Sequence, residues 1–175
     1  MKINNILTEC NADTLIAKTL LFPNKDYTHK KGCNNVLKSM REDLNDEAAF
    51  GIIDDDKSVP KYLKETFHQV KKHNEQLSIL KHNDRPHYIV KLSKAAEDFI
   101  IKNAEKCEIA LSDFNLPSDM KKLKKRTKPN SSLTDPDLRR LILALYQNDT
   151  SDFKKLKQWI LLFKENPYGM DEKDL

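Results

Sequence analysis

Short apolar runs alternate with amphipathic segments in the first part of the chain. The runs at 3–8 and 48–53 have the length of buried strands, and a weaker run at 26–31 has a similar form. Between them, the segments 11–21 and 34–44 carry apolar residues at helical spacing. The order strand, helix, strand, helix, strand is typical of a parallel sheet with helices on its faces.

The same kind of pattern continues toward the middle of the chain. The polar stretch 58–70 is expected to contain one short helix, and 77–81 and 87–92 read as two further strands around the turn at 82–86. A helix that Ser93 can cap follows directly. We therefore expect an α/β fold whose small, mainly parallel sheet of roughly four or five strands is flanked by helices.

The last third of the chain has a different character. The segment 116–132 is basic and bracketed by proline, asparagine and serine, which is typical of a linker or an exposed helix. The segments 134–147 and 151–163 carry apolar residues at helical spacing and predict an antiparallel helical hairpin. We therefore divide the chain into a domain at 1–115, a basic linker at 116–132 and a C-terminal helical hairpin at 133–165 packed on the domain.

Composition narrows the classes of function. The chain has 175 residues and only three glycines, and it lacks both the glycine-rich dinucleotide motif and the P-loop. Its three cysteines form no CxxC pair, so neither a disulfide framework nor a zinc motif is indicated. No apolar stretch has the length of a membrane span or of a secretory signal, which predicts a cytoplasmic protein. The net charge of +4 permits nucleic-acid contact without requiring it.

Acidic residues stand where two of the predicted strands end. Glu9 follows the first run, and Asp54, Asp55 and Asp56 follow the run at 48–53. Parallel neighbours bring their carboxyl ends to one edge of the sheet, so Glu9, Asp54 and Asp56 are expected to converge there. Like charges this close need a cation or a base to offset them, which indicates a hard-cation site. The alternative interpretation is an acidic loop and a surface turn without a ligand.

The residues around these acids resemble the Toprim fold of topoisomerases, bacterial primases, recombination factors and OLD-type nucleases. The resemblance is carried by ILTECNAD at 6–13 and IIDDD at 52–56, and covers roughly residues 1–110. YIVKL at 88–92 with AAEDFI at 95–100 is similar to small stand-alone Toprim-like proteins. The family usually has a glycine after the glutamate, where this chain has Cys10.

The resemblance implies a Mg²⁺-dependent (or Mn²⁺-dependent) enzyme that cleaves phosphodiester bonds in nucleic acid. Asp54 and Asp56 would hold the metal, and Glu9 would act as general acid or base or as a further ligand. Asp13 would support Glu9 or bind a second metal, although an acid in the first turn of a helix is also explained by the helix dipole.

Six cations in the basic segment are candidates for phosphate contacts; the alternative is a solvated linker. They are Lys121, Lys122, Lys124, Lys125, Arg126 and Lys128. Whether the chain is an enzyme stays open at this point. The second hypothesis is a catalytically degenerate protein that binds nucleic acid or regulates a partner, and the third is a cation-binding scaffold. Nucleic acid is the expected partner, a protein partner or a second copy of the chain remains an alternative, and no membrane contact is expected.

Overall fold

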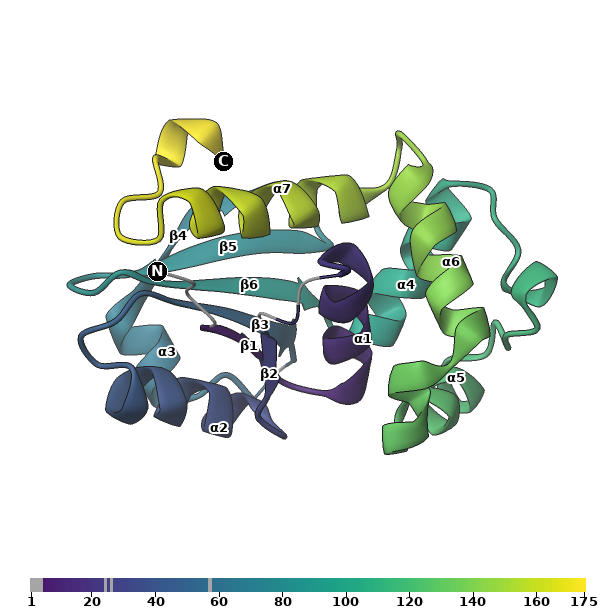
Figure 1. Ribbon diagram of the computed structural model, residues 1–175, viewed down its shortest axis with the longest axis horizontal. Helices are drawn as coiled ribbons and strands as arrows, with labels where there is room; N and C mark the ends of the chain where they lie inside the picture. Colours follow the sequence, from purple (N-terminus) through teal and green to yellow (C-terminus); the bar gives the residue numbers. More distant parts are fainter. Residues whose placement is uncertain (1–4, 24, 26, 57) are drawn as a thin grey trace.

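A mixed six-stranded sheet forms the centre of the computed structural model, which describes residues 5–23, 25, 27–56 and 58–175 (Figure 1). The strand order is β2-β1-β3-β6-β5-β4, and the first four of these run parallel. At the other edge, β5 pairs antiparallel with β6, and β4 pairs antiparallel with β5. The strands are β1 (Ile6–Thr8), β2 (Tyr27–His29), β3 (Ala49–Asp55), β4 (Phe67–Lys72), β5 (Leu77–His82) and β6 (His87–Ser93). The predicted α/β class is confirmed. The expected first residues of two strands, Ile3 and Asp26, lie outside the described residues.

Helices cover both faces of this sheet. The α-helices are α1 (Asn11–Leu20), α2 (Cys33–Lys38), α3 (Lys61–Thr66), α4 (Ala96–Lys106), α5 (Met120–Thr127), α6 (Pro136–Gln147) and α7 (Asp152–Glu165). A π-helical turn at Ser39–Asp43 continues α2, and a 3₁₀ turn at Asn130–Thr134 connects α5 to α6. One face of the sheet packs on α2 and α3, the opposite face packs on α1, α4 and α7, and α6 packs on these three helices (Figure 1).

Strand β3 separates the two cores because its side chains alternate between the faces. Phe50 and Ile52 belong to the larger core, whereas Ala49 and Ile53 belong to the smaller one with α2. Gly51 allows α2 to approach closely: a Cβ atom there would lie 3.2 Å from Val36 Cγ1 and 3.3 Å from Ile89 Cγ1. The same alternation determines which faces the acids at the end of β3 occupy.

Strand β4 is the main departure from the predicted sheet, whereas its partner β5 matches the strand predicted at 77–81. The structure ends the expected short helix at Thr66 and continues directly into β4, a strand that the sequence pattern did not indicate. Most β4 side chains are exposed, as befits an edge strand, so its sequence lacks the alternation of a half-buried strand.

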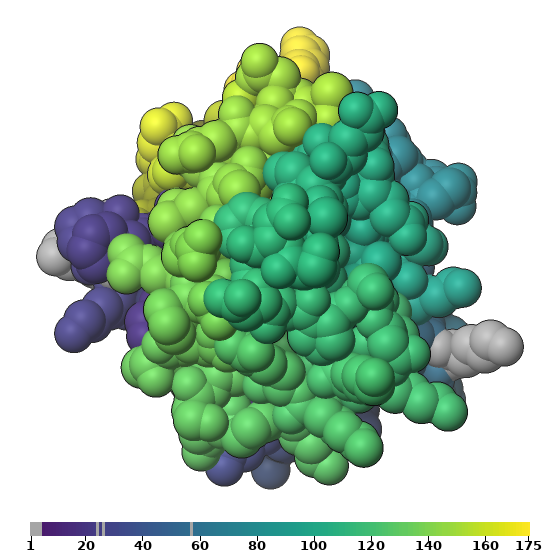
Figure 2. Space-filling view, turned by 90° about the vertical axis from the view of Figure 1, so that its right-hand side faces the viewer, coloured from purple at the N-terminus to yellow at the C-terminus, as the bar shows by residue number. Residues whose placement is uncertain are grey.

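The basic segment 116–132 contains helix α5, docked on the larger core through the fully buried Leu123. Arg126 fixes the helix further, because its guanidinium donates to Asp135 at 2.7 Å and to Asp137 at 3.0 Å. Figure 2 shows that the segment running from α4 toward α7 covers this end of the molecule. Residues of the predicted units 1–115 and 133–165 share one hydrophobic core.

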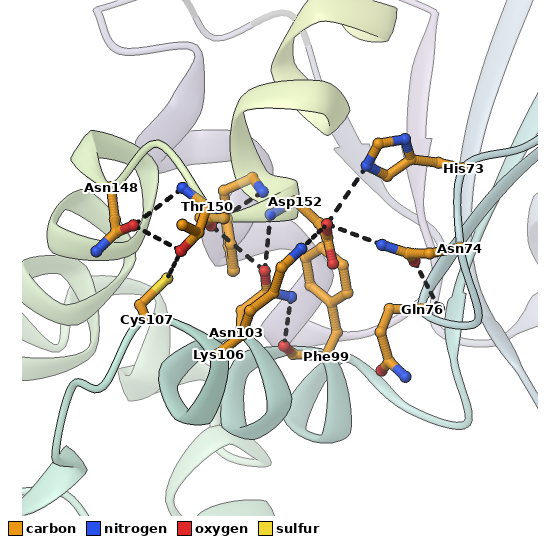
Figure 3. Close-up of polar contacts among 12 residues, drawn as sticks. His73, Asn74, Gln76, Phe99, Asn103, Lys106, Cys107, Asn148, Thr150 and Asp152 are labelled. Carbon is orange, nitrogen blue, oxygen red and sulfur yellow. Dashed lines mark hydrogen bonds and ion pairs between the residues drawn. The ribbon is translucent and has the colours of Figure 1, made fainter.

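Helices α6 and α7 follow one another as the pattern predicted, but Figure 1 draws them in different directions rather than alongside each other. α7 crosses the sheet face, where Phe163 packs on Phe50 with ring centroids 5.2 Å apart. Its first residue, Asp152, joins the helix to the β4–β5 turn and to α4 through a network of polar contacts (Figure 3).

Candidate functional site

The carboxyl ends of the parallel strands bring Glu9 and Asp54 together, as the sequence predicted. Glu9 follows β1, and its backbone N–H donates to the Ile52 carbonyl at 3.1 Å, which extends the β1–β3 pairing. The Glu9 carboxylate turns back onto β3, where Oε2 accepts the backbone N–H of Asp54 at 2.9 Å. Asp54 Oδ1 in turn accepts the N–H of Ala96, the first residue of α4, at 2.8 Å.

A capping box at the start of α1 positions two further side chains. Cys10 is the N-cap: its Sγ accepts the N–H of Asp13 at 3.4 Å, and Asp13 Oδ2 accepts the N–H of Cys10 at 3.1 Å. Asp13 is 0% exposed. Its second oxygen, Oδ1, has no hydrogen-bond partner within the part of the chain that the structure describes. A buried polar atom without a partner is costly, so this oxygen marks a place for a ligand.

Cys10, Asp13 and Asp54 form a compact set of potential metal ligands, which we call the donor cluster. One sulfur or carboxylate oxygen from each lies within 4.8 Å of the others. Two of the three are the acids that the sequence placed here, and the third is a thiol that the sequence interpretation treated as structural. The donor cluster could therefore hold a metal ion.

The electrostatics of the cluster favour an added positive charge. Burial, and then the charges of Glu9 and Glu97, raise the pKa of Asp54 to about 7. Burial and then the charge of Asp54 raise the pKa of Asp13 well above its usual value. Burial also raises the pKa of Glu9, against the hydrogen bonds it accepts from the backbone of Asp54 and Cys33. These carboxyl groups must hold protons or share a cation.

A cleft of about 480 Å³ opens above these acids. Its acidic side is formed by Glu9, Asp54 and Glu97, and Lys31, Lys124 and Lys128 provide cations around it. The remaining lining residues are Cys10, Asn11, Ala12, His29, Gly32, Thr127 and Asn130. We call this space the acidic cleft.

Two polar contacts hold α5 at the edge of the acidic cleft. The Thr127 hydroxyl donates to Glu97 Oε1, which ties α5 to the start of α4. Asn11 Nδ2 donates to the Lys128 carbonyl at 2.6 Å, which ties the end of α5 to α1. The basic helix is thereby placed beside the carboxylates, and the Lys124 charge lowers the pKa of Asp54 slightly against the dominant effect of burial.

Asp56, the second predicted metal ligand of the acidic tip, is not a member of the donor cluster, although it lines a neighbouring pocket with Glu9 and its charge contributes to the raised pKa of Glu9. Strand β3 ends at Asp55, so the alternation that was expected to align Asp56 with Asp54 no longer applies. Asp56 is exposed, and its Oδ1 accepts the backbone N–H and the hydroxyl of Ser58, each at 2.9 Å. Asp55 pairs instead with Lys91 of β6 at 2.5 Å.

The six basic candidates do not share one environment. Lys124 and Lys128 line the acidic cleft. Lys121, Lys122 and Lys125 are exposed and are not among its lining residues. Arg126 is engaged by two carboxylates of the chain itself, so its charge is already partly offset.

Sequence reasoning passed over four residues that the structure places around the acids: Cys10, Asn11, Glu97 and Lys31. Glu97 is not among the predicted site residues, yet it is buried and its charge raises the pKa of Asp54. Cys10 could have been found from its position beside Glu9, because the residue after a strand commonly begins the ligand-binding turn of an α/β fold.

None of the helices in the described parts of the chain combines the length and apolar character needed to cross a membrane. A scan against models of protein families finds no match, and searches of curated proteins and of solved structures find none either. The case for a function therefore rests on the residues of the acidic cleft themselves.

Proposed function

We propose that this protein is a Toprim-like, divalent-cation-dependent enzyme that cleaves phosphodiester bonds in nucleic acid in the cytoplasm. The observation that carries the proposal is the pairing of opposite charges in one cleft. Glu9, Asp13 and Asp54 gather at the sheet edge, and Lys124 and Lys128 lie across from them. Carboxylates that hold a cation and lysines that hold phosphate are the two parts that phosphoryl transfer requires.

The residues present fit a divalent cation. Asp13 and Asp54 would hold it, because both are carboxylates of the donor cluster and Asp13 Oδ1 lacks a partner among the described residues. Mg²⁺ or Mn²⁺, when bound, would neutralise the charge that develops on the phosphate oxygens. Asp56, which binds its own turn at Ser58, has no part in this arrangement.

Glu9 is the candidate for proton transfer. One of its oxygens is fixed by the Asp54 N–H at 2.9 Å, so the carboxylate has a defined orientation at the opening of the acidic cleft. Burial raises its pKa toward the range where a carboxyl group exchanges protons efficiently near neutral pH. Lys124, Lys128 and Lys31 would position the phosphates of the substrate.

The test is a cleavage assay on single- and double-stranded DNA and RNA with Mg²⁺ or Mn²⁺, using Glu9→Gln. Glutamine keeps an oxygen that can accept the Asp54 N–H but cannot take up a proton, so cleavage should fall by about 10²–10⁴-fold. Asp55→Asn is the matched control, because Asp55 is an adjacent acid that faces away and pairs with Lys91. Metal-dependent cleavage that persists in Glu9→Gln would rule out the assigned role.

A second candidate function is that of a nucleic-acid-binding or regulatory protein that uses the same lysines of the acidic cleft but does not cleave nucleic acid. The observation that favours it is that Asp56 accepts hydrogen bonds from Ser58 and is not in the donor cluster. A cation there would have one carboxylate fewer than the sequence predicted. This candidate predicts binding that depends on Lys124 and Lys128 in a protein that leaves every substrate intact. A cation-binding scaffold would show metal binding and no affinity for nucleic acid.

A further inference from the structure

The third member of the donor cluster is a sulfur atom, and this bears on the identity of the cation. We propose that Cys10 is a metal ligand and that the site prefers a thiophilic divalent cation, Zn²⁺ first, over Mg²⁺. The inference rests on the proposed function in one respect, namely that a cation binds between Asp13 and Asp54. It goes further by assigning the thiolate to the first coordination sphere.

The geometry allows all three side chains to reach one ion. Their donor atoms lie within 4.8 Å of one another. Two ligands of a single tetrahedral zinc ion are separated by about 3.3–3.7 Å, given Zn–S distances near 2.3 Å and Zn–O distances near 2.0–2.2 Å. Side-chain movements on the order of 1 Å therefore complete the set.

The capping box holds two of the ligands in place before any cation arrives. Asp13 Oδ2 is occupied by the N–H of Cys10, which leaves Oδ1 buried and, as far as the described residues go, without a partner. The burial of this oxygen is a second sign of a ligand, separate from the clustering of acids. Repulsion among the acids alone would favour a carboxyl group that turns toward solvent. The N-terminus of α1 opposes a cation, but Glu9, Asp13 and Asp54 together outweigh its partial positive charge.

The chemistry of the donors favours a borderline metal. Mg²⁺ prefers six oxygen ligands and dehydrates reluctantly, whereas a thiolate binds Zn²⁺ strongly. Cys10 and Asp54 line the acidic cleft and Asp13 is buried, so a cation could reach the cluster from the cleft. Three protein ligands and one open side match the arrangement of zinc sites that keep a position for substrate.

The chain contains its own controls for this proposal. Cys107 is remote from the acidic cleft and contacts Thr150 Oγ1 at 3.5 Å. Cys33 lines a neighbouring pocket with Glu9 and Asp56 and is not in the donor cluster. Cys107→Ser therefore tests the removal of a thiol as such, and Cys10→Ser tests the removal of this ligand.

The experiment is a calorimetric titration of the full-length, metal-free chain with ZnCl₂ and separately with MgCl₂, without nucleic acid. We expect wild type and Cys107→Ser to bind Zn²⁺ at least about 100-fold more tightly than Mg²⁺. Cys10→Ser should weaken Zn²⁺ binding by about tenfold or more and change Mg²⁺ binding by no more than about threefold. With Co²⁺ as a spectroscopic probe, a thiolate-to-metal charge-transfer band should appear in wild type and disappear in Cys10→Ser.

The outcomes separate this inference from the proposed function. Equal Zn²⁺ affinity in wild type and Cys10→Ser, or a charge-transfer band that persists in the variant, would overturn the role of Cys10 while leaving the cation site intact. Mg²⁺ binding as tight as Zn²⁺ binding would overturn the preference. A wild-type chain that binds none of the three cations would overturn both this inference and the proposed function.

Discussion

Two buried aspartates of this protein have opposite surroundings. Asp152, 2% exposed, accepts hydrogen bonds from Asn74 Nδ2 and Lys106 Nζ, each at 2.9 Å, and lies 3.4 Å from His73 Nε2 (Figure 3). Asp13, 0% exposed, lies among other acids. Its Oδ1 finds no partner anywhere in the described chain.

We interpret the difference as that between an acid that stabilises the fold and an acid that is a candidate ligand. Asp152 is compensated by donors from the β4–β5 turn and α4, so its charge holds three elements together. Asp13 is surrounded by groups that raise its pKa, and the fold leaves it uncompensated. A buried carboxylate in the second situation is expected where a ligand supplies the missing positive charge.

The largest expected effect is on catalysis. Asp54→Asn should reduce metal-dependent cleavage by about 10³-fold or more, because the amide keeps an oxygen for the Ala96 N–H but binds a cation far more weakly. Asp152→Asn, at the other buried acid, should retain cleavage within about threefold in the folded protein. Initial rates on one labelled substrate measure both, and similar losses in the two variants would contradict the distinction.

The next effect is on stability. Asp152→Ala should lower the free energy of unfolding by about 2–3 kcal/mol, since it leaves partly buried donors on Asn74 and Lys106 without their acceptor. Urea denaturation followed by circular dichroism measures it. Asp149→Ala, at a fully exposed acid that pairs with Lys154, is the control and should be close to neutral. Equal stabilities of the two variants would show that the network around Asp152 is not structural.

Cation binding should depend on pH because cations and protons compete for the same acids. The pKa of Asp54 is raised from 3.8 to about 7, so the cation-free folded state binds more protons than the unfolded state between these values. This group therefore lowers the stability of the cation-free protein as pH rises through that window. Cation affinity should increase with pH up to about 7, by up to tenfold per unit for each proton released. Titrations at about pH 5.5 and pH 8 that give equal affinity would contradict this.

The smallest of these effects concerns the basic helix. Substituting both Lys124 and Lys128 with alanine should reduce the slope of log affinity for nucleic acid against log salt by about 1–2, because these lysines line the acidic cleft. The matched control replaces Lys121 and Lys122 with alanine. It has the same net charge as the first double variant and should change the slope less. Fluorescence anisotropy at several salt concentrations measures both, and equal slopes would place nucleic acid outside the cleft.

Local patterns were enough to predict the acids at the sheet edge. Apolar runs before Glu9 and Asp54 indicated neighbouring parallel strands, and the structure joins these two residues by a hydrogen bond. The contacts of the next two acids could not be predicted from this pattern: β3 ends at Asp55, which pairs with Lys91, and Asp56 accepts the backbone N–H of Ser58.

Long-range contacts explain what the sequence could not show. The position of α5 beside the carboxylates depends on the Asn11 contact with the Lys128 carbonyl and on the Glu97 contact with Thr127, which join residues far apart in the chain. Strand β4 is stabilised by pairing with β5 rather than by its own pattern. The Cys10 thiol could not be identified as a potential co-ligand of Asp13 from the sequence, because its position beside Asp13 depends on the capping box of α1.

The most direct test of the account is the thermal stability of Asp13→Asn with and without Zn²⁺ or Mg²⁺. Asparagine can still accept the Cys10 N–H, and it replaces a buried acid whose ionisation the surroundings oppose, so the cation-free variant should melt about 2–4 °C above wild type. A cation that stabilises wild type should leave the variant unchanged, because stabilisation by a ligand requires binding to the folded state. A variant that melts below wild type and is still stabilised by the cation as strongly as wild type would show that Asp13 only caps α1 and that the donor cluster is not a cation site.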